Sequence, residues 1–172
     1  ITVSHPPKII ISEIQTESSL SAKDEFIELY NLNDFEVDLT DFALKKKTSG
    51  GSESNLVSSS HFSGLVPALG YFLIAPQINE DGSQNYQGSY PPNIYYSGKS
   101  YSIAANNTVL LFSKYNNLID KLGFSQANDF ETSPAQNHPK NYSLGRKLLF
   151  SPDLEQSTTQ TYQDTDNNSL DF

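Results

Sequence analysis

The apolar residues of this chain occur in short bursts rather than in the stripes of an amphipathic helix. Several bursts are rich in β-branched and aromatic residues or alternate between apolar and polar positions, as β-strands do. The bursts occupy residues 9–14, 25–31, 37–44, 70–75, 108–112 and 118–122. Gly, Pro, Asn and Ser separate them, and this spacing of short strands is typical of an antiparallel sandwich. The pattern therefore predicts an all-β fold.

The alternation is clearest in residues 25–31. Ile27 and Leu29 fall on one face of the predicted strand, while Phe26, Glu28 and Tyr30 fall on the other. The three consecutive lysines at 45–47 split between two faces of a strand. We interpret them as a solvated edge strand, because lysines protect sheet edges against aggregation.

Three stretches interrupt the rhythm of strands. Residues 48–63 are rich in Ser and Gly and are expected to form a mobile loop. Residues 76–100 form a long connection with many tyrosines, and long connections inside a compact domain are often functional. We expect a single domain over residues 1–172, with its core over about 8–150 and a polar C-terminal segment over 151–172.

Composition narrows the classes of function. The 172 residues include 11 Lys and Arg against 20 Asp and Glu, a net charge of -9. Because a nucleic-acid surface needs clustered cations to neutralise phosphates, no nucleic-acid partner is expected. No stretch approaches the roughly 20 apolar residues of a membrane span, so we expect no membrane insertion by this segment. The chain begins with Ile1 rather than Met, which favours a segment of a larger protein.

Catalytic signatures are missing from the sequence. There is no cysteine, and the three histidines, His5, His61 and His138, do not stand at metal-ligand spacing. There is no Gly-x-Ser-x-Gly elbow and no Gly-rich phosphate loop. Carboxylates are numerous, but their spacing marks no pair for glycoside hydrolysis. We therefore expect a protein that is not an enzyme and has no resident cofactor.

The strands also carry a more specific pattern. Residues 10–14, the sequence DEFIELYN at 24–31 and residues 37–44 resemble the opening of the lamin tail domain family, with Phe42 where the family commonly has Trp. Further resemblances follow in the family's order, at residues 65–73, 107–112 with 118–124, 141–146 and 164–172. Asp120 stands at an Asp of the family pattern, and Arg146 ends another of its elements. The resemblance covers about residues 8–172 and implies an immunoglobulin-like antiparallel β-sandwich with long loops.

The sequence DTDNNSLDF at 164–172 and the Asn- and Ser-rich insertions resemble bacterial members of that family. Those members accompany secreted or surface-anchored proteins, so the resemblance implies an extracellular or cell-envelope location. The residues themselves leave an intracellular location open. The expected function is that of an interaction or scaffold module that binds a protein or a cell-envelope component.

Arg146 is the only arginine in the chain and stands among many carboxylates. Its planar guanidinium matches a carboxylate in bidentate geometry. Glu28 is the predicted partner, with Glu13 as second choice, because a free charge at Glu28 between bulky neighbours is costly to desolvate. We favour a structural ion pair between the sheets or at a sheet edge over a binding or catalytic arginine.

The tyrosine-rich connection offers a recognition surface. Tyrosine supplies rigid amphipathic area that suits contact with a protein or a glycan. The candidates are Tyr86, Tyr90, Tyr95, Tyr96 and Tyr101. They either contact a partner or simply cover the open end of the sandwich. They also form the basis of an alternative function, a glycan-binding module.

Asp164, Asp166 and Asn168 alternate like the first oxygen ligands of a calcium loop, and Asp171 offers a further oxygen. Ser169 stands where an EF-hand loop needs Gly, which excludes an EF-hand. Two interpretations remain. One is a looser calcium site, which would assist glycan binding. The other is a terminal loop whose apolar residues dock on the sandwich.

Overall fold

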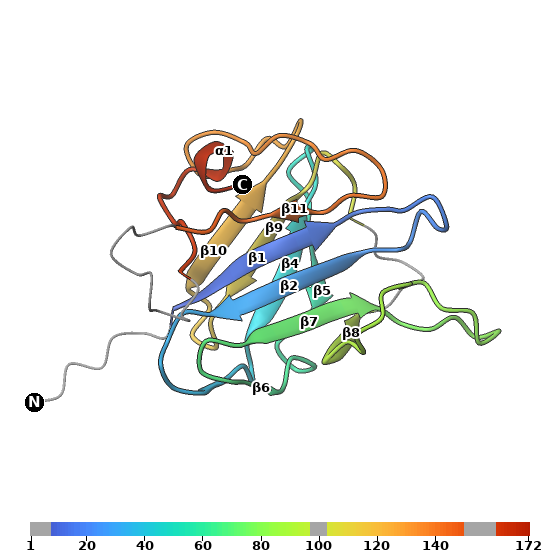
Figure 1. Ribbon diagram of the computed structural model, residues 1–172, viewed down its shortest axis with the longest axis horizontal. Coiled ribbons are helices and arrows are strands. Elements are labelled where there is room, and N and C mark those ends of the chain that lie inside the picture. The colour runs from blue at the N-terminus through green and yellow to red at the C-terminus, as the bar shows by residue number, and fades with distance from the viewer. Residues whose placement is uncertain (1–7, 97–102, 150–160) are drawn as a thin grey trace, which may run out of the picture.

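The computed structural model describes residues 8–96, 103–149 and 161–172, which form two packed β-sheets (Figure 1). The strands are β1 (Ile9–Gln15), β2 (Phe26–Asn31), β3 (Val37–Asp38), β4 (Ala43–Lys47), β5 (Glu53–Val57), β6 (Leu65–Val66), β7 (Tyr71–Pro76), β8 (Ile94–Tyr96), β9 (Thr108–Phe112), β10 (Leu118–Gly123) and β11 (Leu144–Gly145). One sheet has the order β11-β1-β2-β7-β8 and the other the order β10-β9-β4-β5. A third, two-stranded sheet pairs β3 with β6. The structure confirms the predicted all-β sandwich.

Neighbouring strands run antiparallel, except that β7 and β8 run parallel. Ile27 and Leu29 of β2 are fully buried between the sheets, on the face that the alternation predicted. The aromatic rings of Phe42, Phe62 and Phe72 pack against one another in the same core. Glu28 lies on the opposite face of β2, which points away from the core. This outer face of the five-stranded sheet belongs to the region considered below as a functional site.

Residues 48–63 differ from the expected mobile loop, because they contain β5, which pairs with β4. The Ser and Gly residues form the turn before β5, in which Gly51 has a φ of 89°. Leu56 and Val57 then anchor the strand, since both are buried in the core. Two apolar residues thus order a segment whose composition is otherwise typical of a loop.

The lysines 45–47 also differ from their predicted position, because β4 lies between β9 and β5 and is not an edge strand. Lys47 reaches Asp129 at 2.8 Å, and Lys45 lies 4.5 Å from the centre of the Phe112 ring. A central strand tolerates Lys45 and Lys47 because their charged groups meet an aromatic face and a carboxylate.

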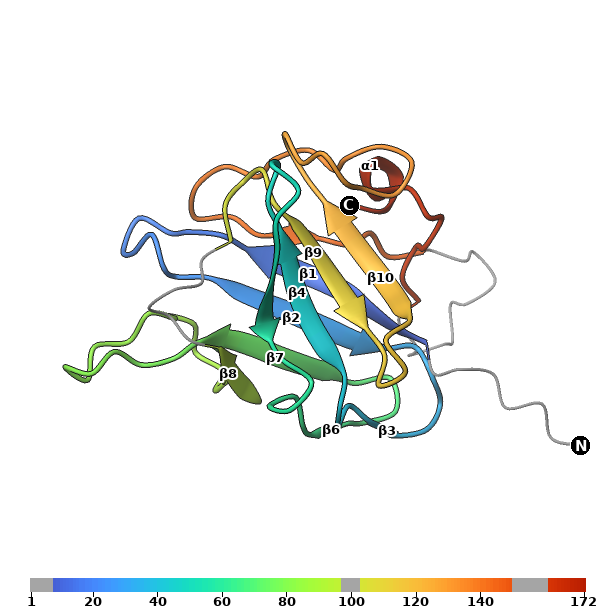
Figure 2. The same cartoon turned by 180° about the vertical axis from the view of Figure 1, so that it is seen from behind.

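Two connections leave the same end of the five-stranded sheet and lie near each other in both views (Figures 1 and 2). They are residues 16–25 between β1 and β2, and residues 77–93 between β7 and β8. Elsewhere the short helix α1 (Asn168–Asp171) lies near β10, close to the C-terminus. Within the described ranges, no helix has the length and apolar character needed to cross a membrane.

Candidate functional site

The side chain of Arg146 is fully buried between β1 and β10, and it joins the two sheets. Its Nη2 donates to both carboxylate oxygens of Asp120, at 3.0 and 2.8 Å. Its Nε donates to the backbone oxygen of Ile11 at 2.9 Å, while the Ile11 N–H donates to Asp120 at 2.5 Å. Arg146 and Asp120 therefore supply the hydrogen-bond partners for a stretch of β1 that β11 does not pair. Burial raises the pKa of Asp120, and Arg146 opposes that rise.

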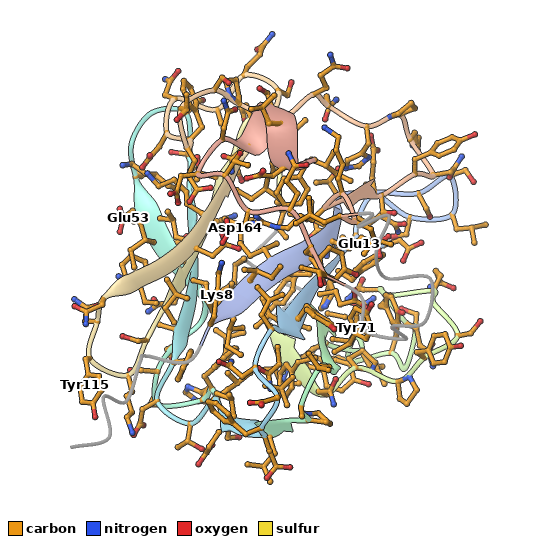
Figure 3. All side chains as sticks on the ribbon, turned by 60° about the vertical axis from the view of Figure 1, so that its left-hand side comes forward. Lys8, Glu13, Glu53, Tyr71, Tyr115 and Asp164 are labelled. Carbon is orange, nitrogen blue, oxygen red and sulfur yellow. The ribbon has the colours of Figure 1, made fainter. Side chains whose placement is uncertain are left out.

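The C-terminal residues complete the surroundings of Arg146. Its Nη1 donates to the backbone oxygen of Gln163 at 3.2 Å and to Asp164 at 3.1 Å. A carboxylate oxygen of Asp171 lies 3.6 Å from the same nitrogen, and the ring of Phe172 lies 4.7 Å from the guanidinium carbon. Lys8 pairs with Asp164 at 2.9 Å from the other side, and these two residues are labelled in Figure 3. The motif at 164–172 is thus part of the sandwich.

Asn168 holds α1 against β10. Its side-chain oxygen accepts from the N–H groups of Gly123 and Glu131, at 2.9 and 3.1 Å. Its side-chain nitrogen donates to the backbone oxygen of Lys121 and to the Glu131 carboxylate, at 2.8 and 2.9 Å. Asn168 is fully buried, so these contacts are shielded from water. Burial first, and then repulsion by Asp120, raises the pKa of Glu131 to about 7.

The predicted pairing of Arg146 with Glu28 is wrong, and so is the second choice, Glu13. Glu28 accepts from the Ser12 hydroxyl at 2.9 Å, and Glu13 accepts from the Ser143 hydroxyl. Both carboxylates lie on the outer face of the five-stranded sheet, whereas Arg146 lies between the sheets. Asp120 takes the place of these partners because β10 brings it across the sandwich to the edge of β1.

The four proposed calcium ligands do not gather around a common point. Asp164 and Asp171 face Arg146, and Asp171 also accepts from the N–H of Thr165 at 3.0 Å. Asn168 uses its amide on β10, and Asp166 is exposed. Among the described residues, no group of three His, Cys, Asp or Glu side chains is placed to hold a metal ion. Arg146 supplies the positive charge that a calcium ion would have brought to these carboxylates.

The tyrosines of the long connection separate into exposed and buried residues. Tyr90 and Tyr95 are 79% and 44% exposed, and Tyr86 is half-buried. Tyr96 is only 2% exposed and donates its hydroxyl to Glu25 at 2.6 Å, so its assignment to the recognition surface is wrong. The alternation within β8 explains this, because neighbouring side chains point to opposite faces. The predicted contribution of Tyr101 lies outside the described residues.

Tyr86 separates two pockets at the loop end of the five-stranded sheet. One, of about 240 Å³, is lined by tyrosines and prolines that include Tyr90, Tyr95 and Pro92. The other, of about 410 Å³, opens beside Phe26, whose ring meets the edge of Tyr86 at 6.1 Å between centroids. Gly88 lines both pockets. We call this region, centred on Tyr86, Tyr90 and Tyr95, the tyrosine surface.

Gly88 allows the tyrosine surface to form. A Cβ atom at this position would stand 1.9 Å from the Tyr86 hydroxyl oxygen and 2.1 Å from its ring. The absence of a side chain lets the Tyr86 ring lie against the backbone. A larger residue at 88 must therefore displace the ring that both pockets share.

Glu25 is a buried carboxyl that the sequence reasoning did not single out. It accepts from the Tyr96 hydroxyl at 2.6 Å and from the Ile103 N–H at 2.9 Å. Burial raises its pKa to about 7, although both hydrogen bonds and the charge of Lys46 act in the opposite direction. The signal was present in the sequence, because the alternation that points Ile27 inward also points Glu25 inward.

Replacing Glu25 with glutamine is expected to flatten the pH dependence of stability. Folding raises the pKa of this carboxyl from 4.5 to about 7, so the folded chain binds the proton more tightly than the unfolded chain. The free energy of unfolding therefore falls as pH rises through this window. Glutamine carries no charge; its Oε1 can accept from the Ile103 N–H, while its Nε2 can donate to the Tyr96 hydroxyl oxygen. At pH 8, the free energy of unfolding of Glu25→Gln should exceed that of the wild type by about 3 kcal/mol.

Urea denaturation at pH 5 and pH 8 measures this difference. Glu17→Gln is the matched control, because Glu17 pairs with Lys140 at an exposed position. The expected result is a much larger gain for Glu25→Gln at pH 8 than at pH 5, while Glu131, Asp120 and Glu28, whose pKa values are also raised, contribute to the remaining pH dependence. Parallel pH profiles for the wild type and Glu25→Gln would show that Glu25 does not titrate in this range.

The two sheets and their buried ion pair define an immunoglobulin-like β-sandwich. The model of the Lamin Tail Domain matches residues 2–126, and the chain therefore belongs to the lamin tail domain family. This is a family of non-catalytic domains that suggests an interaction or scaffold module. The matched range contains Asp120 but ends before Arg146. A comparison with curated proteins gave no match.

Proposed function

We propose that this chain is a protein-interaction module, without catalytic activity of its own, and that its tyrosine surface binds the partner. The observation that carries the proposal is the exposure of Tyr90 and Tyr95 at one pocket, which shares Tyr86 with a second pocket. Loops on a rigid sandwich are suited to recognition, and tyrosine gives large contact area with few rotatable bonds to freeze.

The surrounding protein is proposed to be bacterial and to act outside the cell or in the cell envelope. The resemblance of DTDNNSLDF at 164–172 to bacterial family members supports this part of the proposal. The net charge of -9 supports a protein or cell-envelope partner over a nucleic acid. The partner then meets the long loops at one end of the sandwich.

Changing Tyr90 and Tyr95 together to serine is expected to abolish partner binding while leaving stability within about 0.5 kcal/mol, because both side chains are exposed. Tyr115→Ser is the matched control, since Tyr115 is 76% exposed in the turn between β9 and β10. A displayed library of random 12-residue peptides is selected on the wild-type protein. Enriched peptides should bind the wild type and Tyr115→Ser but not the double variant.

A glycan array run in parallel decides the class of partner. Saturable glycan binding that the double variant loses, without any enrichment of peptides, would replace the proposal with a glycan-binding module. Peptides that bind the double variant as well as the wild type would place recognition away from the tyrosine surface. The absence of both kinds of binding would overturn the proposed function.

A further inference from the structure

The described side chains that line the two pockets of the tyrosine surface include no cation. Asp24 is the only charged residue among those that line the two pockets in the described part of the chain. Its carboxylate accepts from the backbone N–H of Gln87 at 2.9 Å, which ties the β7–β8 connection to the β1–β2 connection. The pockets therefore combine aromatic rings with a fixed negative charge.

Two further carboxylates stand on the adjoining sheet face. Glu13 of β1 and Glu28 of β2 are paired directly across the two strands. Glu28 is two positions along β2 from Phe26, so both side chains lie on the outer face of the sheet. Together with Asp24, these carboxylates act on the Tyr86 hydroxyl and, after its burial, are the causes of its raised pKa. In Figure 3, Glu13 lies on the side of the five-stranded sheet, away from Glu53 and Tyr115.

These carboxylates have no cationic partner within the described ranges. The nearby Lys140 pairs with Glu17 instead. Like charges directly opposite each other destabilise a sheet. Burial raises the pKa of Glu28, and repulsion by Glu13 adds to that rise. The hydroxyls of Ser12 and Ser143 nevertheless hold both carboxylates on this face. A cation from outside would relieve the repulsion.

We propose that the tyrosine surface recognises a basic segment of a protein partner, with a Lys or Arg side chain laid along Tyr86 and Phe26 and its charged group facing Asp24, Glu13 and Glu28. This inference rests on the proposed function and names the chemistry of the partner. Aromatic faces attract cations, and carboxylates pair with them. The net charge of -9 also steers a basic partner toward the protein.

The peptides enriched on the wild-type protein provide the probes. Each is synthesised as selected and again with every Arg replaced by citrulline and every Lys by glutamine. We expect the selected peptides to be rich in Lys and Arg. Removal of their charges should weaken binding about tenfold or more, since a hydrogen bond between charged groups contributes about 1.5–3 kcal/mol. Raising the salt concentration from 50 to 300 mM should weaken the original peptides alone.

The protein side of the contact is tested with Glu13→Gln/Glu28→Gln. Glu53→Gln/Asp166→Asn is the matched control, because it removes the same charge from exposed positions away from the tyrosine surface. Affinity for the basic peptides should fall about tenfold in the first double variant and stay near the wild-type value in the second. The first variant should also be slightly more stable than the wild type, since it removes a cross-strand repulsion.

The outcomes separate this inference from the proposed function. Neutral peptides that bind in a Tyr90- and Tyr95-dependent way would overturn the basic partner and leave the interaction module standing. Equal loss of affinity in both charge variants would also overturn it, because the attraction would then belong to the whole acidic surface. Failure to enrich any peptide would overturn both. A Gly88→Ala variant that folds normally should weaken binding, since it displaces Tyr86.

Discussion

Replacing Arg146 with alanine is expected to lower the free energy of unfolding by about 3–5 kcal/mol, the usual cost of leaving a buried charge without its partner. Asp120 is 3% exposed and would lose both of its Arg146 hydrogen bonds. The backbone oxygens of Ile11 and Gln163 would lose donors at the same time. For a chain of this length, the melting temperature should fall by roughly 10 °C.

Two comparisons make this prediction specific. Arg146→Lys keeps the charge but has no planar fork, so it cannot serve Asp120 and the two backbone oxygens together. The free energy of unfolding of Arg146→Lys should lie between those of the wild type and Arg146→Ala. Lys140→Ala removes a cation from an exposed pair with Glu17, and such pairs contribute about 0–1 kcal/mol. Equal, small losses of stability for Arg146→Ala and Lys140→Ala in urea denaturation would contradict a stabilising role for the buried ion pair of Arg146 with Asp120.

The topology of the sheets explains why the ion pair of Arg146 with Asp120 lies at the edge of β1. β11 pairs with β1 only at Glu13 and Ile14, so no strand of the described ranges pairs with the edge of β1 near Ile11. The Asp120 carboxylate and the Arg146 guanidinium fill this position with side-chain hydrogen bonds. Two residues that stand in separate family motifs thereby meet in one contact. The sandwich is closed at this edge by an ion pair instead of a longer strand.

Local patterns predicted the strands and their faces but not the long-range partners. The two-residue period of β2 alone places Ile27 inward and Glu28 outward, and the structure agrees. The partner of Arg146 depends on which strand edges meet, and Asp120 comes from the opposite sheet. The sequence did contain a signal that Asp120 points into the core. Asp120 stands two residues before Leu122 on β10, so the two side chains share a face, and both are buried.

In the candidate site, too, local patterns predicted some features, and others depended on the fold. The prediction that tyrosines gather at one end of the sandwich needed only their density between β7 and β8. The exclusion of Tyr96 needed the three-residue strand β8, which is too short to show an alternation in sequence. The structure does not gather the four proposed calcium ligands, because alternating Asp residues suit an arginine as well as a metal ion. Only the fold decides that Arg146 reaches Asp164 and Asp171.

The second large effect is expected at Asn168, where replacement with alanine should cost about 3–4 kcal/mol. Its amide oxygen is the hydrogen-bond partner of the Gly123 and Glu131 N–H groups, and burial prevents water from replacing it. Each buried backbone group left unsatisfied costs about 1–3 kcal/mol. The same change frees α1 from β10 and so loosens the carboxylate of Asp171 that faces Arg146.

Asp166→Asn is the control for this prediction, because Asp166 is exposed and asparagine tolerates its φ of 52°. Asn168→Asp gives a sharper test, since it can still accept from both N–H groups. It brings a charge beside the Lys121 carbonyl and the Glu131 carboxylate, which the asparagine NH2 now bridges. Asn168→Asp should therefore approach Asn168→Ala in instability at pH 8 and recover part of the loss at pH 5, where carboxyl protonation restores a donor. If Asn168→Ala and Asn168→Asp unfold at the same urea concentration as the wild type and the control Asp166→Asn, the C-terminal motif does not stabilise the sandwich.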